Sequence, residues 1–119
     1  MAYYLVQAAY TAEAWAAMVK DPQNRAEVIR PVIERLGGSL VGSWMAFGEY
    51  DAVAIIQMTD TVSAAALSLA ASAGGAVKAI KTTPLMTMEE GMAAMRQAAA
   101  AGYRSPSIIA QRTAALTHD

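Results

Sequence analysis

The chain has 119 residues, of which 55% are hydrophobic and 16% charged, and its net charge is -1. This length fits one domain, and the near-neutral charge provides no basic surface for nucleic acid or for an anionic membrane. The absence of cysteine excludes disulfide bonds, thiolate metal sites and cysteine nucleophiles.

The N-terminus, Met1–Tyr4, lacks the basic region and the long apolar stretch of a signal peptide. No segment reaches the roughly 18 uninterrupted apolar residues of a membrane-spanning helix. We therefore expect a soluble, cytoplasmic protein with neither a nucleic-acid partner nor a membrane partner.

Apolar patterns and capping residues predict four strands and four helices. The second helix is expected to begin with Asp21 as its N-cap and Pro22 in its first turn, and Pro31 is expected to kink it. A capping box, Thr87 with Glu90, is expected to open the last helix. In chain order the elements are a strand at Tyr3–Tyr10, helices at Ala12–Lys20 and Asp21–Leu36, strands at Ser39–Phe47 and Tyr50–Thr59, a helix from Asp60 or Thr61 to Gly74, a strand at Ala76–Leu85 and a helix at Met88–Ala101.

The order β-α-β-β-α-β predicts an α+β fold of the ferredoxin-like type, with an additional C-terminal helix. In this plan an antiparallel sheet carries its helices on one face. We expect a single domain over residues 1–102, followed by a C-terminal tail over residues 103–119.

The run Phe47-Gly48-Glu49-Tyr50-Asp51 is predicted to form the tip of a β-hairpin. Glycine at the first central position favours a two-residue type II′ loop made of Gly48 and Glu49. This register places Trp44 opposite Val53, Leu40 opposite Gln57 and Phe47 opposite Tyr50. Both faces of the hairpin are then mainly apolar, so we expect the face without helices to pack on a second copy of the chain, in a homodimer or a higher homo-oligomer.

The distinctive segments of the chain are Tyr4-Leu5-Val6, Thr11, Arg25, Val28, Leu36-Gly37-Gly38 and Phe47-Gly48-Glu49-Tyr50-Asp51. Together they resemble the GYD domain family over roughly residues 2–90. The resemblance implies a dimeric α/β barrel and no particular reaction.

Tyr50 and Asp51 are the candidate catalytic residues. In a functional interpretation Asp51 is a base or a ligand contact near Trp44, because an apolar pocket raises the pKa of a carboxyl group, and Tyr50 donates a hydrogen bond. In the structural alternative Asp51 binds nearby amides of the turn.

Trp44, Tyr4, Tyr50, Asp51 and Arg25 are the candidate ligand-binding residues, and the expected ligand is a small apolar or aromatic molecule. Trp44 suits the wall of such a pocket, but also a core or an interface. Arg25 suits an anionic group of a ligand, but also an ion pair.

The sequence predicts no metal and no cofactor. His118 is the one histidine and stands near the C-terminus, so the usual imidazole ligand sets are missing. Met88, Met92 and Met95 form one helical stripe, which suits an adaptable packing face as well as copper(I).

Three functions fit these observations. The first is a dimeric protein that binds a small molecule or has an accessory role. The second is a cofactor-independent monooxygenase or isomerase that uses Asp51 and Tyr50, an interpretation that rests on fold analogy. The third is a structural or assembly subunit of a homo-oligomer.

Overall fold

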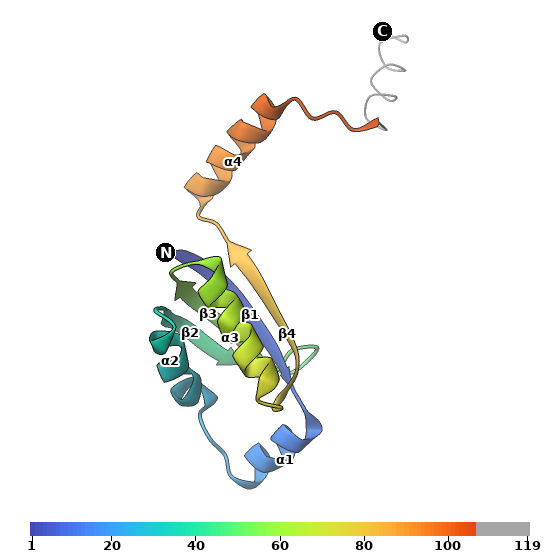
Figure 1. Ribbon diagram of the computed structural model, residues 1–119. Helices are drawn as coiled ribbons and strands as arrows, with labels where there is room; N and C mark the ends of the chain where they lie inside the picture. Colours follow the sequence, from blue (N-terminus) through green and yellow to red (C-terminus); the bar gives the residue numbers. More distant parts are fainter. Residues whose placement is uncertain (107–119) are drawn as a thin grey trace. The chain divides into compact units, whose positions relative to one another are not determined.

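The computed structural model describes residues 1–106 (Figure 1). Most of the predicted tail, residues 103–119, and His118 lie outside the described residues. The chain separates into two compact units, Met1–Leu85 and a second unit that begins at Met86.

The first unit contains a four-stranded antiparallel sheet with strand order β2-β3-β1-β4. Helices α2 and α3 lie on the same face of this sheet (Figure 1). The predicted α+β, ferredoxin-like fold is therefore confirmed. The elements of the first unit are β1 (Ala2–Tyr10), α1 (Ala12–Lys20), α2 (Arg25–Arg35), β2 (Ser39–Met45), β3 (Ala52–Met58), α3 (Thr61–Ala73) and β4 (Val77–Leu85).

Side-chain caps fix the starts of the first two helices. The Thr11 hydroxyl accepts a hydrogen bond from the backbone nitrogen of Ala14 at 3.1 Å, which begins α1 as predicted. The predicted start of α2 at Asp21 is wrong. The Asn24 side chain caps α2 instead, by accepting from the nitrogen of Ala26 at 3.0 Å, so residues 21–24 connect the two helices.

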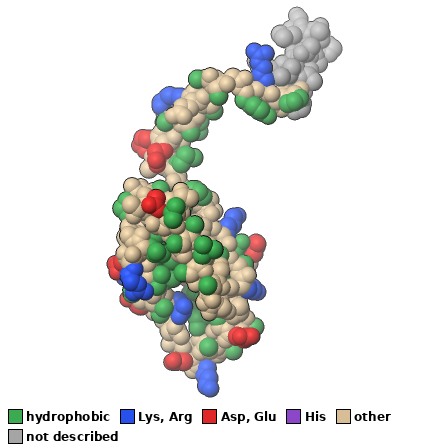
Figure 2. All heavy atoms as spheres, in the orientation of Figure 1, with side chains coloured by type: hydrophobic (Ala, Val, Ile, Leu, Met, Phe, Trp, Pro, Cys, Tyr) green, Lys and Arg blue, Asp and Glu red, His purple; other side chains and the backbone are tan. Residues whose placement is uncertain are grey.

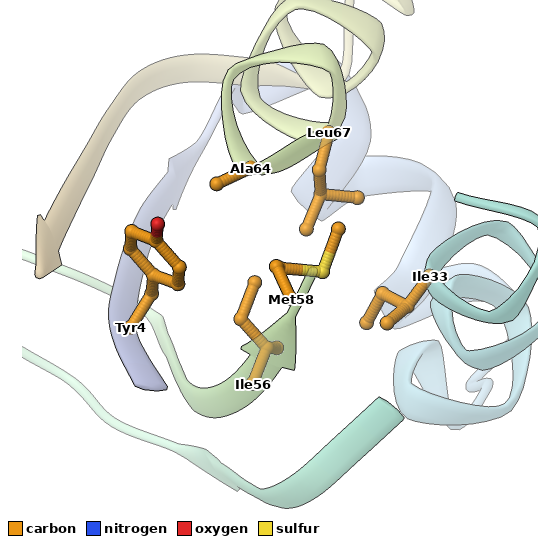
Figure 3. Close-up of a cluster of buried hydrophobic side chains, with 6 residues drawn as sticks. All are labelled: Tyr4, Ile33, Ile56, Met58, Ala64 and Leu67. Carbon is orange, nitrogen blue, oxygen red and sulfur yellow. The ribbon is translucent and has the colours of Figure 1, made fainter. Parts of the chain in front are cut away.

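A compact hydrophobic core joins the sheet to α2 and α3 (Figure 3). Each of its buried side chains is at most 6% exposed, so their removal from water is a main source of the unit's stability. The core contains Tyr4 from β1, Ile56 and Met58 from β3, Ile33 from α2, and Ala64 and Leu67 from α3.

Two glycines connect α2 to β2 at a point where the chain passes close to β3. Gly37 has a φ of +86°, a conformation that favours glycine. A Cβ atom on Gly38 would overlap the Met58 sulfur and the backbone oxygen of Gln57. The absence of a side chain at Gly38 therefore lets β2 begin directly beside β3.

The predicted register of the β2–β3 hairpin is correct from Gly42 to Met45 and wrong near its base. Trp44 lies opposite Val53, as expected. The register shifts between Gly42 and Leu40, toward the start of β2, and Leu40 lies opposite Ile56 rather than Gln57. A β-bulge at this point adds one residue to the edge strand β2, and the simple alternation of apolar residues cannot reveal it.

The predicted two-residue hairpin loop is also wrong. The strands stop at Met45 and resume at Ala52, so residues 46–51 form the connection. Gly48 does not have the positive φ that a type II′ turn requires at this position, and Phe47 is fully exposed rather than paired with Tyr50. The backbone nitrogen of Asp51 donates to the oxygen of Ala8 at 2.9 Å, which ties the end of the loop to β1.

The other face of the sheet carries no helix of the first unit. Tyr4 lies opposite Ile56 on the helix-bearing face, so their neighbours Leu5 and Ile55 point the other way. Trp44 also lies on this helix-free face and is 57% exposed. The helix-free face thus carries an apolar cluster of Leu5, Trp44, Val53 and Ile55, and the same face also carries Gln7, Gln57 and Lys81.

The second unit contains α4 (Met88–Ala101). The predicted capping box is confirmed, because Thr87 and Glu90 each accept a hydrogen bond from the other's backbone nitrogen. Gly102 ends the helix with a φ of +74°. Within residues 1–106, no helix has the length and apolar character needed to cross a membrane.

Candidate functional site

A cavity of about 1070 Å³ lies within the first unit, on the helix-bearing side of the sheet. Its base is formed by strand residues, and its sides are formed by residues of all three helices. Figure 2 shows hydrophobic side chains gathered over this unit. Representative wall residues are Val6, Ala54 and Ile80 from the strands, Trp15 from α1, Val32 from α2 and Leu67 from α3.

The cavity exists because side chains on the helix-bearing face become smaller along the strands. In β1 the inward residues run from Tyr4 in the core to Ala8 in the cavity, and in β3 they run from Ile56 to Ala54. Large side chains fill the space between sheet and helices at one end, whereas alanines leave it open at the other. Packing at the Tyr4 end therefore holds the helices over an unfilled space at the alanine end.

Trp15 forms the α1 side of this cavity and is held in place by two contacts. Its ring lies edge-on against Tyr10, with 5.4 Å between the ring centroids and an interplanar angle of 87°. Its indole nitrogen donates to Oδ2 of Asp51 at 3.3 Å. The same oxygen accepts from the backbone nitrogen of Tyr10 at 2.9 Å. Asp51 thus connects the hairpin loop, the end of β1 and the indole of Trp15.

Asp51 itself does not belong to the cavity wall, among the residues that the structure describes. Its carboxylate is directed to β1 and α1, away from the hairpin loop in which it stands. The geometry makes Asp51 a positioning residue for Trp15. Tyr50, also in the loop over residues 46–51, is half-buried and likewise outside the wall.

The remaining candidate residues have separate positions. Arg25 lines the cavity, and its Nη1 atom donates to Oε1 of Gln23 at 2.9 Å. Trp44 borders the cavity on the edge strand β2, but its ring lies close to Gly42 and opposite Val53, on the helix-free face. Tyr4 is buried in the core.

Charged side chains are sparse at the cavity wall. Arg25, Glu27 and Arg30 line it, all from α2. Arg30 and Glu27 form an ion pair of 3.9 Å. Within residues 1–106 there is no group of three or more His, Cys, Asp or Glu side chains arranged to hold a metal ion.

The sequence interpretation missed Trp15 and the alanines at the base of the cavity. Trp15 stands four residues after the N-cap Thr11, and only the fold brings it to Asp51, 36 positions away. Ala8 and Ala52 look like ordinary strand residues until the register places them opposite each other at the base of the cavity. The decrease of side-chain size along one face of β1 and β3 was the one available signal.

The model of the family described as the GYD domain matches residues 4–95. No curated protein and no solved structure matches the chain. The match covers most of the chain, including the entire cavity, the helix-free face and the loop that carries Asp51. The chain belongs to the GYD domain family.

Proposed function

We propose that this GYD-domain protein is a homodimer that binds a small apolar or aromatic molecule in the cavity between its sheet and its helices. The observation that carries the proposal is the cavity of about 1070 Å³. Ligand sites in proteins have volumes of roughly 300–1,000 Å³ and mainly apolar walls with a few polar groups. The walls here fit that description, with Val6, Ala54 and Ile80 at the base and Arg25 among the few charged residues.

The contacts around the cavity favour binding. Trp15 has its orientation fixed by the Asp51 carboxylate and by the Tyr10 ring. The core beside the cavity holds α2 and α3 against the sheet. A preorganised wall loses little conformational entropy when a ligand arrives, so more of the contact energy remains as affinity.

The dimer is supported by the helix-free face of the sheet. Leu5, Val53 and Ile55 form its centre, and Trp44 lies exposed beside them. Large contiguous apolar surfaces are uncommon on soluble monomers. A second copy that presents the same face would cover both surfaces and leave the helix-bearing sides, with their cavities, on the outside.

A reaction that uses Asp51 or Tyr50 as acid or base has less support. Both residues stand outside the cavity wall within the described part of the chain. Oδ2 of Asp51 already accepts two hydrogen bonds. A general base needs to be within hydrogen-bond reach of its substrate, and the Asp51 carboxylate is instead directed to Trp15 and to the backbone nitrogen of Tyr10. Binding therefore describes the site better than catalysis by these residues.

The test uses the neutral fluorescent probe N-phenyl-1-naphthylamine, which becomes bright in an apolar site. Ala54→Phe places a large ring at the base of the cavity, and Ala98→Phe makes the same change on the exposed surface of α4. We expect the wild-type protein and Ala98→Phe to bind the probe and Ala54→Phe to lose most of the signal, with unchanged circular dichroism. Equal binding by a folded Ala54→Phe variant would reject the cavity as the site.

A further inference from the structure

We propose that the ligand of this cavity is an apolar molecule with a single carboxylate group, and that Arg25 binds this carboxylate. The inference rests on the proposed function and names the chemical class of the ligand. It is carried by the position of Arg25, by the balance of charge around the cavity and by the present partner of the guanidinium group.

Arg25 is the first residue of α2 and is half-buried. It lines the main cavity and also a small adjoining pocket of about 140 Å³ under α1. Tyr10, Met18 and Gln23 line both spaces as well. Arg25 therefore stands at the junction of the two spaces, where an acidic group of a bound molecule would meet it.

The charges of the cavity wall leave one positive charge in excess. Two arginines and one glutamate line the cavity. Arg30 is paired with Glu27 at 3.9 Å, so these two neutralise each other. Arg25 remains, and within residues 1–106 it forms no ion pair with a carboxylate. A ligand with one negative charge balances this site, whereas a dianion would leave a negative charge in an apolar cavity.

The guanidinium group of Arg25 has donors to spare. Its observed partner is the neutral amide oxygen of Gln23, which accepts from Nη1 at 2.9 Å. Arginine carries five N–H donors in a planar fork that matches the two oxygens of a carboxylate. The Gln23 contact orients the group without neutralising it, which leaves the charge available to a ligand.

The same geometry argues against a neutral ligand as the best fit. An apolar molecule that fills the cavity excludes water from the half-buried Arg25, and the lost hydration costs free energy unless a partner replaces it. A carboxylate replaces the water with charge-assisted hydrogen bonds. The start of α2 adds a favourable field, because the N-terminus of a helix carries a partial positive charge. A carboxylate is thus favoured over an uncharged group of the same shape.

Matched acids and amides test this inference by calorimetry on the full chain. The probes are naphthalene-2-carboxylate against naphthalene-2-carboxamide, and decanoate against decanamide. In at least one pair we expect the wild-type protein to bind the acid about tenfold or more tightly than the amide. We expect Arg25→Gln to remove this preference by weakening acid binding alone. Arg35→Gln is the control, because Arg35 lies in the last turn of α2 and outside the cavity wall.

The outcomes separate the two proposals. Equal affinities for acid and amide, or an acid preference that survives Arg25→Gln, would overturn the carboxylate inference and leave binding in the cavity intact. Binding of N-phenyl-1-naphthylamine without binding of either acid would also overturn the carboxylate inference and leave binding in the cavity intact. Failure of the neutral probe as well would reject the proposed function itself. Binding of the neutral probe by Arg25→Gln shows that the variant keeps its cavity.

Discussion

The carboxylate of Asp51 accepts a hydrogen bond from the indole nitrogen of Trp15 at 3.3 Å, although the two residues are 36 positions apart. The same oxygen also caps the backbone nitrogen of Tyr10 at 2.9 Å. One carboxylate therefore ties the hairpin loop to the end of β1 and to the wall of the cavity. Within the Gly48–Asp51 segment, Asp51 is thus the residue whose side chain contacts Trp15.

Replacement of Asp51 by alanine tests this role. The change leaves two half-buried donors, on Tyr10 and Trp15, without their acceptor, which costs about 2–3 kcal/mol in the free energy of unfolding. Urea denaturation measures the loss. Glu49→Ala, an exposed position in the same loop, is the control and should change stability by less than about 0.5 kcal/mol.

Fluorescence separates positioning from general stability. In a Trp44→Phe background Trp15 is the one remaining tryptophan. We expect Asp51→Ala to shift its emission to longer wavelength, because the indole moves into water, while the protein remains folded by circular dichroism. An unchanged emission maximum would show that Asp51 does not hold the ring.

Substitution by alanine is expected to lower stability at Gly38 and to raise it at Gly91. A Cβ atom at Gly38 overlaps the backbone oxygen of Gln57, which cannot easily move, so Gly38→Ala should destabilise the first unit by about 2 kcal/mol or more. Gly91 lies inside α4 with open space around it, so Gly91→Ala should favour the helix by about 0.5–1 kcal/mol. Thermal unfolding and helical circular dichroism measure the two effects. Equal stability of Gly38→Ala and the wild-type protein would contradict the close approach of β2 and β3.

A charge on the helix-free face should prevent dimer formation. Ile55→Glu places a carboxylate at the centre of the proposed interface, where pairing of two copies would bury two like charges. We expect light scattering to give the mass of one chain for this variant. Val62→Glu, at an exposed position of α3, is the control and should keep the mass of two chains. A dimer of Ile55→Glu would exclude this face as the interface.

The cap of α3 should make stability depend on acid pH. The backbone nitrogen of Ser63 donates to Oδ1 of Asp60 at 2.7 Å, and this bond lowers the pKa of Asp60 below its ordinary value of 3.8. Because the pKa of Asp60 is lower in the folded state than in the unfolded state, its cap contributes fully to stability above pH 3.8. This contribution is lost as the pH falls through the folded-state pKa of Asp60. The amide introduced by Asp60→Asn does not titrate. The difference in melting temperature between the wild-type protein and Asp60→Asn should therefore shrink as the pH falls below 3.8. A constant difference between pH 6 and strongly acidic solution would contradict the assignment.

Local signals in the sequence were sufficient to predict the elements of the fold. Thr11 and the Thr87–Glu90 box mark helix starts because their side chains bind backbone groups only a few residues away. The start of α2 was misplaced because Asp21 and Asn24 are both good caps, and local chemistry does not choose between them. The β-bulge beside Gly42 was missed because it depends on how β2 packs against β3.

The candidate site was harder to predict than the fold. Arg25 was named as a candidate from its type and position, and it lines the cavity; its role in binding stays a prediction. Trp15 was not identified, since its contact with Asp51 depends on the path of the loop over residues 46–51. The cavity itself arises where small residues such as Ala8 and Ala52 lie opposite each other, and a sequence indicates missing volume only when such pairs are known.

Native mass spectrometry of the full chain with added N-phenyl-1-naphthylamine tests the dimer and its binding cavity together, because it reports the oligomer and its ligand in one measurement. We expect the mass of two chains with up to one probe molecule per chain, and two chains without probe for Ala54→Phe. Single chains, or an Ala54→Phe dimer that carries as much probe as the wild-type protein, would contradict this expectation.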